Sequence, residues 1–285
     1  MRIISTVREL RKQVSELNLS PLGFVPTMGA LHNGHISLVT IAIKECPLVV
    51  VSIFVNPTQF NDKEDLKNYP RTMEEDLALL KKHLRKEDIV FTPGDEEVYP
   101  APDKRVFSFG NLDNVMEALQ RPGHFNGVGQ VVSRLFDIVS PDVAFFGQKD
   151  FQQVAVIRSL VRQLKLDVKI KACPIIREPD GLAMSSRNRL LDKDTRRRAP
   201  VIFKTISRAA SLIAVMDIPQ IKQFVKSSIE KEPGFKIEYF EIVDDTDLIP
   251  VRKKSAIDKK KHYFGCIAVK TGKIRLIDNI EIPLV

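Results

Sequence analysis

Two histidines three residues apart are the first side chains whose spacing suggests chemistry. His32 and His35 lie in PTMGALHNGH, residues 26–35, between a short apolar run and a helical pattern. At a helix start they share one side, beside backbone N–H groups without intrahelical partners. Such an end attracts phosphate, and Gly29 and Gly34 let a nucleotide approach closely. The alternative, two ordinary surface histidines, fits the strand–turn–helix setting less well.

Three further segments carry polar groups that suit the same ligand. Lys149 and Asp150 directly follow an apolar strand pattern and could meet a phosphate and a ribose hydroxyl, although an exposed Lys–Asp pair is the plain alternative. The loop 181–187 offers two hydroxyls and a guanidinium, which suit a phosphate clamp. The basic loop 121–127 could line the same cleft or be structural.

Two glutamines complete the set of candidates. Gln59 follows the apolar run LVVVSIFV, and Gln153 follows the Lys149–Asp150 pair. An amide both donates and accepts hydrogen bonds, which suits a hydroxylated substrate, and a solvated amide is an equal alternative for each. The sequence has no Walker A motif, and Gly127-Val128-Gly129 lacks the third glycine of a dinucleotide fingerprint.

The elements that must position these residues alternate between strand and helix. Repeated β-α-β units over residues 1–176 predict an α/β fold, a parallel sheet with helices on both faces. Residues 177–285 predict a smaller α+β domain, helices first and strands after. The expected strands are 22–27, 48–55, 88–92, 142–146, 167–173, 235–243, 263–269 and 273–277, and the expected helices are 34–45, 73–84 with a Thr72–Glu75 capping box, 129–139, 151–164, 193–215 and 219–230.

Composition narrows the class of protein. The 285 residues are 44% hydrophobic and 28% charged, as in ordinary globular proteins, with no apolar run long enough for a membrane span. Three isolated cysteines without metal spacing predict free thiols in a reducing, cytoplasmic compartment. Most of the net charge of +8 follows residue 176, which indicates a polyanionic partner, either nucleic acid or ATP phosphates.

Taken together, these segments resemble the pantothenate synthetase (pantoate–β-alanine ligase) family. The motifs that carry the resemblance are VPTMGALHNGH, VSIFVNPTQF, YPRT, RPGHFNGV, FFGQKDFQQ, DGLAMSSRN and the late RLIDN. The resemblance implies a Rossmann-like domain with a C-terminal lid, a homodimer, and adenylation of pantoate by ATP with Mg²⁺. β-Alanine would then attack the pantoyl adenylate to give pantothenate. No nucleic-acid or membrane partner is implied.

The resemblance also implies roles for individual residues. His35, the family's proton donor, Lys149 and Arg187 would be catalytic, and Gln59 and Gln153 would hold pantoate, Gln59 also β-alanine. Asp76 or Glu75 would lie near Mg²⁺. ATP would contact Met28, Gly29, Ala30, Leu31, His32, Asn33, Gly34, His35, Gly147, Gln148, Lys149, Asp150, Ile176, Met184, Ser185, Ser186 and Arg187. Gln148 departs from the family, which more often has Glu there.

Two other readings share part of this pattern. A nucleotidyltransferase or a ligase like the aminoacyl-tRNA synthetases uses the same His-x-Gly-His logic, although a complete synthetase needs a larger tRNA-binding region. A nucleic-acid-binding protein would account for the basic C-terminal third, but it would leave the first 176 residues unexplained.

Overall fold

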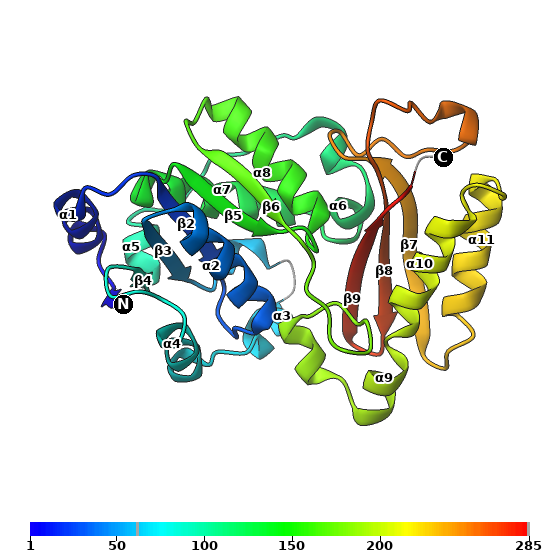
Figure 1. Ribbon diagram of the computed structural model, residues 1–285, viewed down its shortest axis with the longest axis horizontal. Coiled ribbons are helices and arrows are strands. Elements are labelled where there is room, and N and C mark those ends of the chain that lie inside the picture. Colours follow the sequence, from blue (N-terminus) through cyan, green and yellow to red (C-terminus); the bar gives the residue numbers. More distant parts are fainter. Residues whose placement is uncertain (61–62, 284–285) are drawn as a thin grey trace.

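The larger of the two sheets is six-stranded and parallel (Figure 1). The computed structural model describes residues 1–60 and 63–283. All five neighbouring pairs are parallel, which confirms the predicted α/β class. The strand order is β1-β4-β3-β2-β5-β6, with β1 Arg2–Ile4, β2 Leu22–Thr27, β3 Leu48–Ile53, β4 Ile89–Phe91, β5 Val143–Gly147 and β6 Lys169–Cys173.

Helices cover both faces of this sheet, so its central strands are apolar on both sides. Every residue of β3 is buried: Leu48 and Val50 pack on one face, and Val49 and Val51 pack on the other. One face carries α1 Val7–Leu17, α7 His124–Val139 and α8 Phe151–Leu164, and the other carries α2 Asn33–Glu45 and α4 Met73–Lys81. The shorter helices are α3 Lys63–Asn68, α5 Asp95–Val98 and α6 Met116–Gln120.

Helix α7 begins five residues earlier than the predicted start at residue 129. Its glycines serve a close approach and do not interrupt the helix. A Cβ on Gly127 would lie 2.4 Å from the carbonyl oxygen of Thr58 and 2.6 Å from Cα of Gln59. Gly127 therefore lets the helix pack directly against the backbone that carries Gln59.

The predicted capping box of Thr72 and Glu75 is wrong. Thr72 makes no side-chain capping bond to α4, and its hydroxyl donates instead to Asp76 at 3.2 Å. The helix also ends at Lys81 and not at residue 84.

The second, smaller sheet is antiparallel and has the order β7-β8-β9, with β7 Phe235–Asp244, β8 Tyr263–Thr271 and β9 Ile274–Glu281. It follows α9 Lys193–Arg198, α10 Val201–Leu212 and α11 Ile218–Ile229, as the helices-then-strands pattern predicted. The prediction of a single helix over 193–215 is wrong. The helix is interrupted between α9 and α10 at Pro200, which has no N–H to continue the helical hydrogen bonds.

Strand β7 contains a bulge at Glu238, where its register with β8 shifts between Ile237 and Tyr239. Ile237 and Phe240 pack into the core of the second sheet and its helices, whereas Glu238 and Tyr239 both line a cavity on the opposite side. A bulge allows two consecutive side chains to share a face. Two polar side chains consequently point toward the first domain.

The two sheets lie side by side, with α10 and α11 on the outer face of the smaller one (Figure 1). Contacts between the domains include the rings of Phe151 of α8 and Phe264 of β8, whose centroids are 4.5 Å apart. The boundary placed at residue 176 stays a prediction. Within residues 1–60 and 63–283, no helix is long and apolar enough to cross a membrane. The three cysteines are buried and unpaired.

Candidate active site

The predicted nucleotide segments meet where the order of the sheet reverses direction. From β2 the chain runs outward through β3 and β4, and β5 then returns to pair with the other side of β2. Ligands of open α/β sheets bind at the carboxyl ends of strands at such a switch point. The loops 28–32 after β2 and 148–150 after β5 therefore lie next to each other.

The loop after β2 is held by one buried carboxylate. Gly29 and Ala30 have φ angles of 77° and 49°, and the left-handed region is unfavourable for alanine. Asp76, only 2% exposed, accepts from the N–H of Ala30 at 2.9 Å and of Leu31 at 2.7 Å, besides the Thr72 hydroxyl. These charge-assisted bonds fix the loop in an otherwise strained shape.

The two histidines cap α2 reciprocally. Nδ1 of His32 accepts from the N–H of Gly34 at 3.1 Å, and Nδ1 of His35 accepts from the N–H of His32 at 3.3 Å. Both Nδ1 atoms are therefore acceptors, so in each neutral ring the hydrogen is on Nε2. The predicted pair at the helix start thus also forms the capping box.

Both imidazoles are uncharged at neutral pH. Burial, then the charge of Lys149, lowers the pKa of His32 to about 4. Burial, followed by His32 and Lys149, lowers the pKa of His35 to about 3. The site therefore offers two neutral Nε2–H donors beside one ammonium group.

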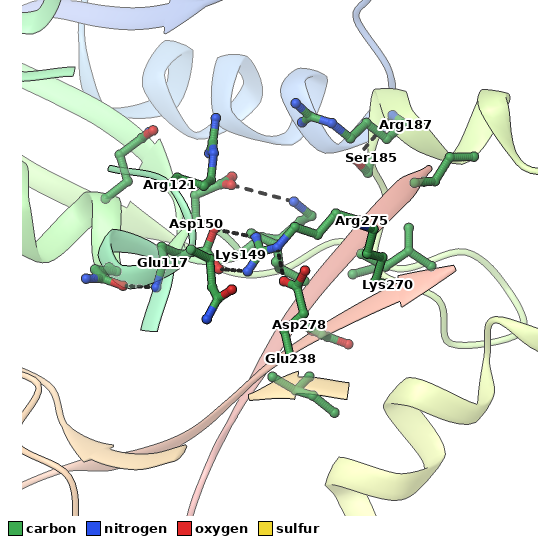
Figure 2. Close-up of a pocket in the computed structure, with 18 of the residues that line it drawn as sticks. Glu117, Arg121, Lys149, Asp150, Ser185, Arg187, Glu238, Lys270, Arg275 and Asp278 are labelled. Carbon is green, nitrogen blue, oxygen red and sulfur yellow. Dashed lines mark hydrogen bonds and ion pairs between the residues drawn. The ribbon is translucent and has the colours of Figure 1, made fainter. Parts of the chain in front are cut away.

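Lys149 lies at the other side of the switch point, and its ammonium is 3.6 Å from Asp150 (Figure 2). Its side chain is 18% exposed. The loop is tied to β6 by the N–H of Gln148, which donates to the carbonyl of Cys173 at 2.8 Å. Ser185 caps the 3₁₀ helix Ser186–Leu190, which contains Arg187, and the Ser185 hydroxyl accepts from the N–H of Arg187 at 3.3 Å.

Gln59 is buried at the end of the 3₁₀ helix Pro57–Gln59, in a network that fixes both its backbone and its amide. Asn56 donates to its side-chain oxygen at 3.3 Å and to the carbonyl of Gly127 at 3.2 Å. His124 lies 2.8 Å from the Gln59 carbonyl and binds it through Nδ1. Gln153 is half-buried at the start of α8 and, like Gln59, lines two adjoining cavities.

Two adjoining cavities join these groups, a smaller one of about 210 Å³ beside the histidines and a larger one of about 950 Å³ between the domains. The predicted site residues that line one or both are Met28, His32, Gly34, His35, Gln59, Gly147, Lys149, Asp150, Gln153, Ile176, Met184, Ser185, Ser186 and Arg187. The other predicted residues line neither cavity: Gly29, Ala30 and Leu31 are buried, Gln148 is half-buried and Asn33 is exposed.

The carboxylates expected near Mg²⁺ do not form a metal site. Both oxygens of Asp76 accept hydrogen bonds from the loop, and Glu75 is exposed, 3.7 Å from Arg189. Among the residues that the structure describes, no group of three His, Cys, Asp or Glu could hold a metal ion. This donor set does not fit a protein-held Mg²⁺.

Several wall residues of the larger cavity were not singled out from the sequence, and most of these come from the second domain. Glu117, at the start of α6, binds Arg275 of β9 through both oxygens, at 2.5 and 2.7 Å, and accepts from the Tyr239 hydroxyl (Figure 2). Burial would raise the pKa of Glu117, but the bonds and charge of Arg275 together lower it. The basic loop 121–127 does line the cleft, through Arg121, His124 and Phe125.

The basic runs of the second domain divide between solvent and cleft. Arg196 pairs with Asp180, and Arg197 and Arg198 pair with Asp194, on the surface of α9. Arg275 is half-buried in the wall of the larger cavity, and Lys270 and Lys273 lie exposed at its rim. Part of the positive charge that the sequence places after residue 176 therefore faces the site.

Known proteins with a similar sequence or structure share one description. A family model described as Pantoate-beta-alanine ligase matches residues 2–281. Pantothenate synthetases of Porphyromonas gingivalis and Bacteroides thetaiotaomicron are 50% and 48% identical, with 99% of each chain covered. The crystal structure of pantothenate synthetase from Thermus thermophilus has a TM-score of 0.90 and 39% identity over 100% of both chains.

A second solved structure was obtained with ligands. It is pantoate-beta-alanine ligase from Francisella tularensis, complexed with Beta-gamma ATP and β-alanine, with a TM-score of 0.81 and 33% identity over 100% of this chain and 99% of that one. The family model spans nearly the whole sequence, and the relatives match it end to end. The chain therefore belongs to the pantoate–β-alanine ligase family.

Proposed function

We propose that the cleft joins pantoate to β-alanine at the expense of ATP, through a pantoyl adenylate. The observation that carries the proposal is the convergence of His32, His35 and Lys149 on the wall of one cavity that Gln59 and Gln153 also line. Donors for phosphate and amides for a hydroxy acid thus share one space. The family membership and the ligands of the Francisella tularensis structure support the same assignment.

In the first step, a carboxylate oxygen of pantoate attacks the α-phosphorus, and the bond to pyrophosphate breaks. Lys149 and Arg187 neutralise charge on the phosphates, and the Nε2–H groups of His32 and His35 donate hydrogen bonds as that charge redistributes. The low pKa of His35 favours a hydrogen-bond donor over a group that gives up its proton. Gln59 and Gln153 orient pantoate.

In the second step, the neutral amine of β-alanine attacks the acyl carbon, the acyl–phosphate bond breaks, and AMP leaves. The amine loses a proton as the amide forms. This step needs the mixed anhydride to be protected from water, and the walls contributed by both domains serve that purpose.

Mg²⁺ and the cellular location are proposed on separate grounds. Because the candidate carboxylates are otherwise engaged, we place Mg²⁺ on the triphosphate and water, and route no step through it. A cytoplasmic location is proposed from the three unpaired thiols.

A homodimer is proposed from the family resemblance alone. We expect light scattering to give twice the mass of one chain, 32.3 kDa, across micromolar concentrations. A single-chain mass throughout that range would reject the dimer.

The reaction itself has a direct assay. Purified protein with ATP, Mg²⁺, pantoate and β-alanine should produce AMP, pyrophosphate and pantothenate, and pantoate alone should support only the adenylation half-reaction. ADP and phosphate as products would contradict an adenylate mechanism.

Substitutions should separate nucleotide chemistry from substrate recognition. Lys149→Ala or His35→Ala should lower adenylation by roughly 10²–10³, the scale for one lost stabilising donor. Gln59→Ala or Gln153→Ala should weaken pantoate use by roughly tenfold while ATP affinity changes little, since an unpaired buried group costs about 1–3 kcal/mol. Lys169→Ala, exposed on β6, is the matched lysine control. Intact pantoate use with weakened ATP binding in both glutamine variants would mean that the pantoate pocket is misplaced.

The protonation state of the histidines can be read without substrate. At pH 6, nitrogen-detected NMR should show His32 and His35 as neutral Nε2–H rings, because their pKa values are about 4 and 3. His262, whose pKa is raised by its bond to Glu281, is the internal control and should be largely protonated in the same spectrum. The free energy of unfolding should fall as pH drops from about 6.5 to 4. Over this range His32 and His35 bind protons in the unfolded chain but stay neutral in the folded protein. A doubly protonated His35 ring at pH 6 would contradict the neutral-donor role.

A further inference from the structure

The late motif RLIDN ends with two buried polar residues that the proposed mechanism does not use. Asp278 and Asn279 lie on β9 of the second domain, 5% and 2% exposed, and both line the larger cavity. Buried polar groups at such a position need a structural or functional partner.

The Asn279 side chain reaches across the domain boundary to the loop after β5. Its Nδ2 donates to the carbonyl of Gln148 at 2.9 Å and to the carbonyl of Lys149 at 3.0 Å. An amide nitrogen has two hydrogens, so this pair of carbonyls accounts for both. The second domain thus hydrogen-bonds directly to the backbone of Lys149.

Asn279 is in turn held by a buried ion pair. Arg177 binds both oxygens of Asp278, at 2.6 and 3.0 Å, and Asp278 accepts the backbone N–H of Asn279 at 2.8 Å. The guanidinium of Arg177 also lies over the ring of Phe203, 3.7 Å from its centroid. The amide of Asn279 therefore projects from a fixed base.

We propose that Asn279 is a positioning residue for adenylation, which holds the loop 148–149 so that the Lys149 ammonium faces the phosphates. Asn279 acts on the reaction through Lys149. The inference rests on the proposed function, because it assumes that Lys149 serves ATP chemistry. Its consequence is that the second domain contributes to the first chemical step as well as to enclosing the site.

The test is a double-mutant cycle on the rate of pyrophosphate release with ATP and pantoate. Asn279→Ala alone should lower kcat about tenfold or more, with little change in KM for pantoate. In a Lys149→Ala background, the same substitution should cost less than about twofold, because residues that act through one another are not additive. Asn279→Asp keeps the shape but presents oxygen to the two carbonyls, so it should not restore the rate.

Asn111→Ala is the matched control. Asn111 also donates across the domain boundary to backbone carbonyls, those of Asp247 and Leu248, at 2.8 and 3.4 Å, but it lies outside both cavities' walls. It should leave the rate near that of the unsubstituted protein. Melting temperatures identify folded variants. Asn279→Ser, a smaller side chain with one donor, replaces Asn279→Ala if that variant does not fold.

Three outcomes would overturn the proposal: a full-rate folded Asn279→Ala, an equal loss in the presence and absence of Lys149, or an equal loss in Asn111→Ala. The last would reveal a general effect of loosened domains. Failure of the proposed function would show separately, as an unsubstituted protein that forms no AMP.

Discussion

The pairing of β5 with β2 is the constraint on which the site depends. The chain has already laid β3 and β4 on one side of β2, so β5 can join the centre of the sheet only on the other side. That reversal leaves two neighbouring carboxyl ends whose loops diverge over opposite faces. One loop supplies the two imidazoles and the other supplies Lys149, and neither could form the phosphate surface alone. The remaining contacts of the site adjust this geometry.

Buried charged groups hold the second domain against the first. Glu117 and Arg275 form a bidentate pair, with Tyr239 and Glu238 completing the bonds. Such pairs add little net stability, since desolvation offsets much of the attraction, but losing one partner costs about 3–5 kcal/mol. Their main effect is on orientation: few relative positions of the domains satisfy all these groups. The same orientation brings β9 against the loop of Lys149.

Local patterns predicted the parts of the fold that are local in origin. The strand–turn–helix around His32 and His35, the buried run of β3 and the strands of the second sheet all follow from periodicity and turn residues. The long-range contacts do not. The loop 29–31 depends on a carboxylate 45 and 46 residues away, and the Lys149 loop on an amide 130 residues away. Nothing in the composition around Asp76 distinguishes a loop clamp from a metal ligand, and Gly127 looks like a helix breaker until its neighbour is known.

The bulge at Glu238 makes the length of β7 matter as much as its composition. Before the extra residue, side chains alternate in one phase, and after it they alternate in the other, which is why Ile237 and Phe240 both enter the second core. Removing one residue at the bulge would restore regular alternation, so Ile237 and Phe240 would stay in the core and one of the two polar side chains would be lost from the cavity face. A deletion elsewhere in β7 would instead shift the alternation of the residues beyond it and exchange their two faces. The extra residue thus serves the contact with the first domain, where it adds a second polar side chain, and not the core of the second sheet.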